Sequence, residues 1–409
     1  MAPRLLLALT VLAQAPLSLL AQDADRFGDG ALRERAHRLA RECILVDGHV
    51  DLPYRLKVEN FRYTKEFLGI PVESGEGDFD YVRARAGGLD APFMSVYIPA
   101  AQQGPNLYGG RALADSLISL VEGVAATSPD KFAIATHPDS VRAQFARGVV
   151  SLPMGMENGA PLAYPEDVAH FAARGIRYVT LTHSKDNHIC DSSYDTTGTW
   201  GGLSPYGSLL LDELVAHGIM IDVSHVSDSA FYQVLRRVDV PVIASHSSLR
   251  HFTPGFERNM SDEMVRMLRD NGGVVMINFG STFVDGRVAE ERRAYRERVG
   301  ALLEARGMAF GDASAKPVLD SLAAAEPLPF ANVEIVADHI DRAVELAGID
   351  HVGLGSDFDG VGDSLPTGLK DVRDYPNLIY VLLERGYSDE DLRKLLGENL
   401  LRVWGVYAG

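Results

Sequence analysis

The chain has 409 residues, of which 46% are hydrophobic and 23% are charged, and it contains only two cysteines. This ordinary globular composition excludes a disordered, collagen-like or disulfide-stapled chain. The net charge of −17 argues against nucleic acids and anionic membranes as partners, since both attract proteins through a positive field.

The first residues are typical of a secretory signal peptide. A single cation, Arg4, precedes the apolar run Leu5–Val11, and small residues surround the expected cleavage point near Ala21. We therefore expect residues 1–21 to be removed and residues 22–409 to form a single domain that is exported, either to the periplasm or out of the cell. No other stretch has the roughly 18 apolar residues that a membrane-spanning helix needs.

Short apolar runs recur along the chain, and helical patterns separate most of them. Near-continuous apolar strands that alternate with helices are typical of a parallel sheet covered on both faces. Eight such runs predict a (β/α)8 barrel of the TIM type, and a doubly wound open sheet is the alternative. The predicted strands are Ile44–Val50, Phe93–Ile98, Val149–Met156, Arg177–Thr182, Met220–Ser224, Val240–Ser245, Gly273–Asn278 and His351–Gly355.

Helical periodicity and capping residues predict the intervening helices. Ser227 and Ser261 each precede an acidic residue, which is typical of a helix start. Residues 284–330 are charged and alanine-rich, and we expect them to form an inserted helical excursion with a helix over Ala289–Arg306. The other predicted helices are Ala31–Arg41, Arg111–Ala126, Pro165–Ala173, Leu209–His217, Asp228–Arg237, Asp262–Asp270, Val333–Ala347 and Asp389–Leu396.

The two cysteines are expected to remain free thiols. Cys43 precedes the first predicted strand and Cys190 follows the fourth, so the two lie at opposite ends of a parallel sheet. A strand rises about 3.3 Å per residue, which places them beyond the roughly 7 Å that a disulfide can span.

Ionisable residues gather at the carboxyl ends of six predicted strands. His49 and Asp51 end the first strand two residues apart, so they point to the same face. This end carries the active site in parallel barrels. One such residue is commonly a cap or a turn former, but a set on successive strands indicates a site. The set comprises His49, Asp51, Glu157, His183, His225, His246 and Asp357.

Imidazoles and carboxylates that converge on one barrel mouth predict a transition-metal site, with zinc as the first choice. One metal ion takes only three or four protein ligands, so five or more candidates indicate two ions with a shared ligand. Glu157 is the candidate bridge because its carboxylate has two oxygens. No glycine-rich phosphate loop follows a predicted strand, which argues against nucleotide-dependent chemistry.

The chain resembles the membrane (renal) dipeptidase family of zinc peptidases, whose barrels are of the amidohydrolase type. The resemblance runs from about residue 38 to residue 405. It rests on the following segments, which occur in this order: VDGHVDLP, GMENG, LTHS, GLSPYG, IDVSHVSD, SHSS followed by RN, ADHID, HVGLGSDFDGV and GENLLRVW.

The resemblance implies a ligand set for two zinc ions. His49 and Asp51 would bind one ion, His225 and His246 would bind the other, and Glu157 would bridge the pair. The two ions would hold a shared water that becomes the attacking hydroxide.

The resemblance also gives roles to three further residues. His183 would lie near the scissile carbonyl, Arg258 would hold the substrate carboxylate, and Asp357 would transfer the proton. Asp357 as a further metal ligand is the alternative for that residue. The alternative for Arg258 is an ion pair at the helix start with Asp262 or Glu263.

These residues predict a zinc-dependent dipeptidase for substrates with a free C-terminal carboxylate, and the family implies that a C-terminal D-residue can be accepted. One alternative is another amidohydrolase-type enzyme, such as a lactonase or an amidase. Those barrels usually begin with His-x-His, whereas this chain has His49 and Asp51 in a His-x-Asp pair. The other alternative is a non-catalytic metal-binding or peptide-binding protein, which would not need Asp357, His183 and Arg258.

Partners are predicted from the same comparison. Dipeptides are the expected substrates, no nucleic acid is expected, and family members are often homodimers. The segment Val403–Gly409 carries no hydrophobic tail, so we expect the lipid anchor of mammalian members to be absent.

Overall fold

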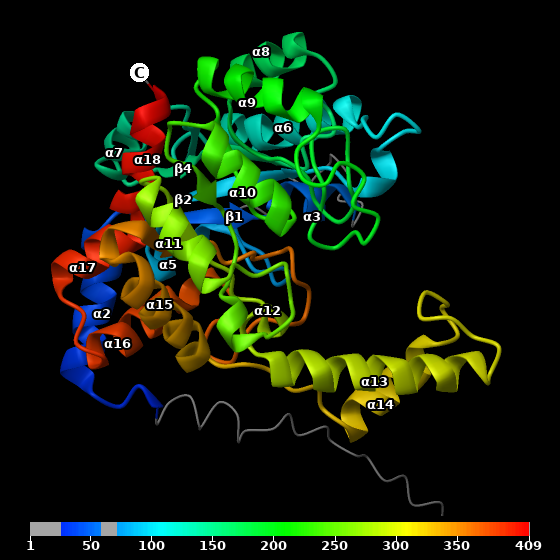
Figure 1. Ribbon diagram of the computed structural model, residues 1–409. Coiled ribbons are helices and arrows are strands. Elements are labelled where there is room, and N and C mark those ends of the chain that lie inside the picture. The colour runs from blue at the N-terminus through cyan, green and yellow to red at the C-terminus, as the bar shows by residue number, and fades with distance from the viewer. Residues whose placement is uncertain (1–25, 59–71, 409) are drawn as a thin grey trace, which may run out of the picture.

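Eight parallel strands close into a barrel in the computed structural model, which describes residues 26–58 and 72–408 (Figure 1). The order around the barrel is β1-β10-β9-β8-β7-β6-β5-β2. The predicted (β/α)8 barrel is confirmed, whereas the predicted signal peptide lies outside the described residues. The barrel strands are β1 (Leu45–Val50), β2 (Leu89–Tyr97), β5 (Met154–Glu157), β6 (Ile176–Thr180), β7 (Met220–Asp222), β8 (Ile243–Ala244), β9 (Val274–Ile277) and β10 (Val352–Leu354).

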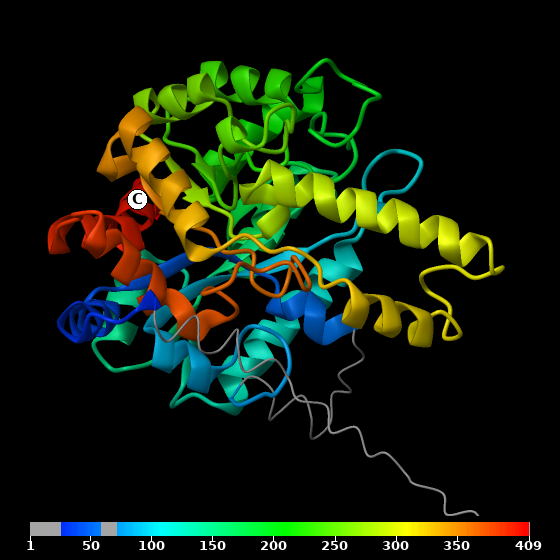
Figure 2. The same ribbon diagram turned by 90° about the horizontal axis from the view of Figure 1, so that it is seen from below.

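Helices surround the barrel on its outer side (Figures 1 and 2). None of those in the described part of the chain is long and apolar enough to cross a membrane. The helices are α2 (Gly30–Glu42), α3 (Leu52–Val58), α5 (Tyr81–Gly87), α6 (Arg111–Thr127), α7 (Pro138–Phe145), α8 (Pro165–Ala173), α9 (Pro205–Ala216), α10 (Asp228–Arg237), α11 (Asp262–Asp270), α12 (Ser281–Val284), α13 (Gly286–Glu304), α14 (Lys316–Ala325), α15 (Val333–Ala347), α16 (Tyr375–Glu384), α17 (Asp389–Arg393) and α18 (Asn399–Ala408).

The expectation of one strand over Val149–Met156 is wrong. The segment forms two strands that belong to different sheets, since β4 (Val150–Leu152) pairs with β3 (Phe132–Ile134) outside the barrel and β5 belongs to the barrel. Pro153 separates them. Its missing N–H cannot continue a ladder, while its carbonyl accepts a hydrogen bond from Met94 N at 2.8 Å.

Strand β2 begins four residues before the predicted start. Its first residues, Leu89–Pro92, include a charge and a proline that conceal the strand in the sequence. Asp90 is nevertheless buried, because its carboxylate accepts a hydrogen bond from Leu45 N at 3.1 Å and pairs with Arg85 at 3.0 Å. Both cysteines are buried and unpaired, as expected.

Aromatic side chains fill the barrel beneath its carboxyl end. The ring of Phe93 lies 5.3 Å from that of Tyr178 and 5.2 Å from that of Trp404, measured between centroids. A side chain at Gly155 would overlap the Tyr178 ring, so glycine is needed where β5 passes these packed rings. The hydroxyl of Tyr178 reaches upward to His49 Nδ1 at 2.8 Å. The packed aromatic rings therefore support His49, the first residue of the predicted site.

The barrel closes between its first and last strands, β1 and β10, which lie about three hundred residues apart in the chain. Beyond the strands, Asp357 N donates to the carbonyl of His49 at 3.1 Å and Asp51 N donates to the carbonyl of Phe358 at 2.8 Å. The contacts that close the barrel therefore involve three residues of the predicted site, His49, Asp51 and Asp357.

The excursion over residues 284–330 is confirmed and contains two helices, α13 and α14. They run side by side and project away from the barrel (Figures 1 and 2). Val299, Leu303 and Ala315 form a small core between them. The part of α13 from Gly286 to Glu297 lines a cavity together with loops that follow β8 and β9.

Candidate metal centre

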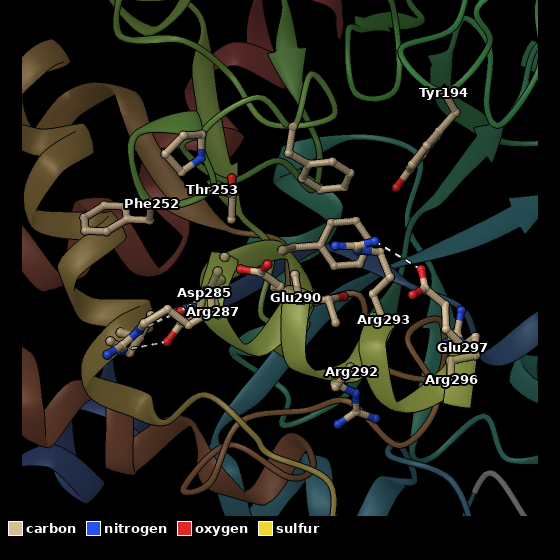
Figure 3. A pocket seen from close by; sticks show the side chains of 18 residues that line it. Tyr194, Phe252, Thr253, Asp285, Arg287, Glu290, Arg292, Arg293, Arg296 and Glu297 are labelled. Atoms are coloured by element: carbon tan, nitrogen blue, oxygen red, sulfur yellow. Dashed lines mark hydrogen bonds and ion pairs between the residues drawn. The ribbon is translucent and has the colours of Figure 1, made fainter. Parts of the chain in front are cut away.

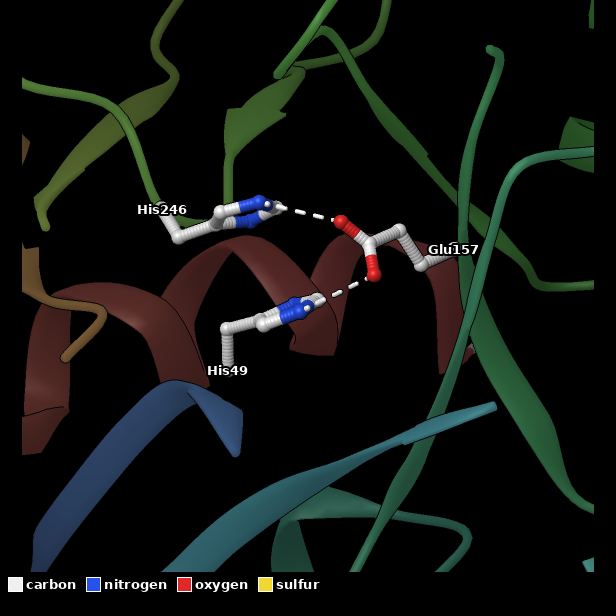
Figure 4. Close-up of side chains that lie close together, drawn as sticks. All are labelled: His49, Glu157 and His246. Carbon is white, nitrogen blue, oxygen red and sulfur yellow. Dashed lines mark ion pairs between the residues drawn. The ribbon is translucent and has the colours of Figure 1, made fainter. Parts of the chain in front are cut away.

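The carboxylate of Glu157, at the end of β5, lies at the centre of the predicted site. Its Oε2 is 3.4 Å from Nε2 of His49, and its Oε1 is 3.2 Å from Nε2 of His246. Figure 4 shows these two rings directing their nitrogens at different oxygens of the one carboxylate. The two oxygens thus face two different sets of donors, which is the geometry a bridging ligand requires.

Two further histidines approach the same carboxylate. Nε2 of His225 lies 3.2 Å from Oε1 of Glu157 and 2.9 Å from Nε2 of His246. Nε2 of His183 lies 3.6 Å from the same oxygen. The His183 side chain is 19% exposed, against 6% for His225 and 1% for His246. His183 is therefore the histidine of this group that faces the solvent-filled mouth.

The structure brings together all seven ionisable residues predicted at the strand ends. They form three overlapping groups in which the donor atoms lie within 4.8 Å of one another. Glu157 and His49 each belong to two groups, so the groups merge into one cluster. The groups are His49, Glu157 and His246; Glu157, His183 and His225; and His49, Asp51 and Asp357.

A hydrogen-bond chain fixes the tautomer of His246. Ser245 Oγ donates to a carboxylate oxygen of Asp222 and lies 2.8 Å from Nδ1 of His246. The hydroxyl hydrogen already points to Asp222, so the hydroxyl oxygen accepts a hydrogen bond from Nδ1–H of His246. Nε2 then carries no hydrogen, and its lone pair can bind a metal ion. Asp222 also accepts hydrogen bonds from Ser224 N and Ser245 N at 3.0 and 2.8 Å, so it stiffens both strand ends.

The same logic applies to His49 on the opposite side. The hydroxyl of Tyr178 donates to the carbonyl of Gly48 at 3.1 Å, so its oxygen accepts from Nδ1 of His49. Nε2 of His49 then carries no hydrogen and presents its lone pair. This buried atom has no hydrogen-bond partner, and the same holds for Oδ1 of Asp51. Buried lone pairs without partners are costly, and a bound cation would satisfy them, so the residues fit a metal ion.

Several site residues adopt a left-handed backbone. Of the described non-glycine residues with positive φ, all but one follow barrel strands at this end: Asn158 (74°), His225 (69°), Asp357 (65°) and Asp359 (64°). Asn, Asp and His tolerate this region better than other residues, but it remains uncommon. Two of these strained positions, His225 and Asp357, carry side chains of the cluster.

The two central carboxyl groups have opposite pKa shifts. Burial opposes the ionisation of Glu157, but the surrounding imidazoles outweigh it and hold the pKa of Glu157 well below its usual range. Burial, followed by the charge of Asp51, raises the pKa of Asp357 well above its usual range. One carboxylate is thus kept ionised and the other is suited to carry a proton.

Comparison with known proteins identifies the family. The sequence profile of the membrane dipeptidase family, peptidase family M19, matches residues 33–408. The chain belongs to the membrane dipeptidase family. An uncharacterized dipeptidase of Schizosaccharomyces pombe is 31% identical over 381 residues, which cover 90% of this chain and 82% of the relative. Membership makes this chain a metallopeptidase of the dipeptidase type.

Solved structures agree with this assignment. The probable dipeptidase PvdM from Pseudomonas aeruginosa superposes with a TM-score of 0.77 at 26% identity, covering 93% of this chain and 99% of that one. A metallopeptidase from Rhodobacter sphaeroides, liganded with a phosphinate mimic of the dipeptide L-Ala-D-Ala, superposes with a TM-score of 0.70 at 25% identity, covering 88% of this chain and 98% of that one.

Arg258 of this dipeptidase-family chain lies beside the histidines and not at the start of α11. Its side chain is buried, and its guanidinium is hydrogen-bonded to Ser247 Oγ, the carbonyl of His246 and Nε2 of His225, at 2.9, 2.7 and 3.0 Å. The helix-start alternative is wrong, because Arg258 makes these contacts and no ion pair with Asp262 or Glu263, and Asp262 pairs with Arg342 instead. Nε of Arg258 has no partner.

Sequence reasoning missed several groups that complete the site. Asn278 Nδ2 donates to Oδ2 of Asp357 at 2.8 Å, and the ring of Tyr97 lies 4.8 Å from that of His183. Both residues lie at the carboxyl ends of barrel strands, so the position that indicated the histidines also applies to Asn278 and Tyr97. Tyr194 stands over His225 with ring centroids 5.9 Å apart, but it lies in a loop and carried no such signal.

The seven clustered side chains at the strand ends, called the donor cluster below, form the floor of a cavity of about 710 Å³ at the barrel mouth. This volume lies in the usual range for small-molecule sites, about 300–1,000 Å³. Asp51, Glu157, His183, His225 and Asp357 line the floor, and tyrosines and residues of α13 line the walls. The dipeptidase-family centre is therefore open to a small substrate.

Gly360 is needed because its backbone touches the cluster. A Cβ at this position would overlap Oδ1 of Asp357 and Oδ2 of Asp51. We expect Gly360→Ala to displace both carboxylates and lower kcat/KM by about tenfold to a hundredfold, since misplacement by about 1 Å has effects of this size. Gly405→Ala, whose Cβ would meet open space, is the matched control. Equal activity of the two variants would contradict the argument.

Proposed function

We propose that the protein is a zinc-dependent dipeptidase that hydrolyses dipeptides with a free C-terminal carboxylate. The observation that carries the proposal is the carboxylate of Glu157, which offers one oxygen to His49 and the other to His225 and His246. A centre for one ion would not need both oxygens, so two ions are proposed.

These contacts support the ligand assignment that the resemblance implies. His49 and Asp51 would hold one zinc ion, His225 and His246 would hold the other, and Glu157 would bridge them. Bound there, zinc would act as a Lewis acid on the substrate carbonyl and lower the pKa of water towards 7.

Two residues of the chain then carry the proton and the developing charge. Asp357 is proposed to take the proton of the attacking water and deliver it to the leaving amine. Asn278 holds its Oδ2 at 2.8 Å, which leaves Oδ1 to exchange the proton. His183 is proposed to donate a hydrogen bond to the carbonyl oxygen as negative charge develops there. Its exposure to the cavity supports this role over that of a ligand.

Arg258 is proposed to bind the substrate carboxylate, because its unpartnered Nε–H calls for an acceptor and its guanidinium borders His225. A charge-assisted contact of this kind contributes about 1.5–3 kcal/mol. We expect Arg258→Leu to lower kcat/KM about tenfold to a hundredfold on a free-acid dipeptide, and much less on the matching C-terminal amide.

The control for this prediction is Arg237→Leu, which removes a guanidinium paired with Asp212 at the end of α10. It should affect the acid and the amide alike, and zinc content should be equal in all three proteins. Equal losses on the two substrates in Arg258→Leu would show that another group reads the carboxylate.

One assay tests the proposed function as a whole. The purified protein is given a small panel of dipeptides with and without a chelator, and free amino acids are measured. Release that the chelator abolishes and zinc restores is the expected result. Release from lactones or simple amides alone would favour another amidohydrolase-type activity. Metal binding without release from any substrate would favour a binding protein.

Several finer points stay predictions. The ligand in the Rhodobacter sphaeroides structure mimics a dipeptide with a C-terminal D-residue, which supports including alanyl-D-alanine in the panel. Export after loss of residues 1–21 and assembly into a homodimer are checked by fractionation of cells and by the mass of the purified protein in solution.

A further inference from the structure

A second cavity, which we call the annex, adjoins the catalytic cavity on the side of α13. Its volume is about 1020 Å³, which exceeds that of the catalytic cavity. The two cavities share part of their lining, which we call the seam. The seam consists of Tyr194, Thr282, Phe283, Arg292 and Arg296.

Aromatic rings lead from the donor cluster into the annex. Tyr194 stands over His225, Phe256 lies 6.0 Å from Tyr194, and Phe283 lies 5.8 Å from Phe256, measured between ring centroids. Figure 3 shows Tyr194 and Phe252 at opposite ends of the annex, with the side chains of α13 along its lower side. The apolar lining is completed by Pro254, Val284, Ala289 and Ile335.

The charged side chains around the annex nearly balance. Arg292 is held by the carbonyls of Pro329 and Asp363, at 3.0 and 2.5 Å. The others comprise three arginines and three acidic residues, including two ion pairs of 3.0 and 3.1 Å. Aromatic walls favour an apolar occupant over a charged one, and the rim has only one arginine in excess of its acidic residues. These six residues are Arg287, Arg293, Arg296, Asp285, Glu290 and Glu297.

We propose that the annex binds the side chain of the substrate's C-terminal residue and selects a large apolar or aromatic one. The inference rests on the proposed function, with Arg258 as the group that binds the carboxylate. The guanidinium carbon of Arg258 lies 5.7 Å from the centre of the Phe283 ring at the seam. Carboxylate and side chain leave the same Cα, so a carboxylate on Arg258 brings its side chain to Phe283 and the annex.

The test compares kcat/KM for alanyl-alanine, alanyl-phenylalanine and phenylalanyl-alanine. The wild type should prefer alanyl-phenylalanine over alanyl-alanine by about tenfold to a hundredfold, the range for added groups in an apolar pocket. Ala289→Trp places a bulky ring in the annex from α13 and should lower this preference several-fold while alanyl-alanine is cleaved as before. Ala301→Trp is the matched control, because Ala301 is exposed on the same helix and lines neither cavity.

Each of the other possible results contradicts one step of the proposal. No preference in the wild type, or equal losses on all substrates in a folded Ala289→Trp protein, would show that the annex is not a side-chain subsite. A loss confined to phenylalanyl-alanine would assign the annex to the N-terminal residue. If Ala289→Trp does not fold, Phe256→Ala removes a ring from the same wall and is read in the same way. A wild type that cleaves none of the three would refute the proposed function itself.

Discussion

Glu157→Gln is expected to release metal from both sides of the centre and to abolish measurable dipeptide hydrolysis. The substitution keeps the size of the side chain but replaces one of the two ionised oxygens with an amide nitrogen, which cannot act as a ligand while it carries two hydrogens. Oε1 and Oε2 face different histidines, so no single rotamer of glutamine can serve both. The measurements are metal content by elemental analysis and turnover of a dipeptide at saturating substrate.

Glu166→Gln is the matched control, since Glu166 is exposed on α8 and should change neither quantity. Loss of about one equivalent of metal from Glu157→Gln, with the second held as tightly as before, would show that Glu157 serves one ion. The ligand assignment would then have to be rebuilt around the group of His49, Asp51 and Asp357.

Asp357→Asn should keep the metal and lower kcat by about 10²–10⁴-fold, the usual contribution of general acid–base catalysis. The amide can still occupy the space beside Asn278 and Gly360, but it cannot take up and return a proton. Metal content and kcat are measured on the same preparation. If the variant loses one equivalent of metal, Asp357 is a ligand, an arrangement that its place beside His49 and Asp51 also permits.

The composition of the site could be predicted from the sequence for a physical reason. In a closed parallel barrel every strand delivers its last residues to one rim, so polar residues after successive apolar runs must meet. His49, His225 and His246 were found in this way. Tyr178 is different: whether it orients an imidazole depends on distances across the barrel, and no local pattern encodes such distances.

The errors in the fold have equally specific causes. Val149–Met156 reads as one strand because most of its residues are apolar, and only tertiary pairing separates β4 from β5 at Pro153. The annex was not predicted at all. Its walls come from loops after β8 and β9 and from the excursion, and sequence patterns do not indicate which loops face one another. Asp357 was predicted from its place at a strand end and Arg258 from the resemblance, whereas the roles of both came from the resemblance and await the variants described above.

The pairing of β1 with β10 also determines when the metal centre can come into being. His49 and Asp51 are made early, but the backbone bonds that tie them to Phe358 and Asp357 need a strand made near the end of synthesis. Contacts between such distant segments form slowly, because a long loop must close first. A chain that ends before β10 should therefore leave the His49 side of the centre open, and an ion on that side should be held only after β10 has paired with β1.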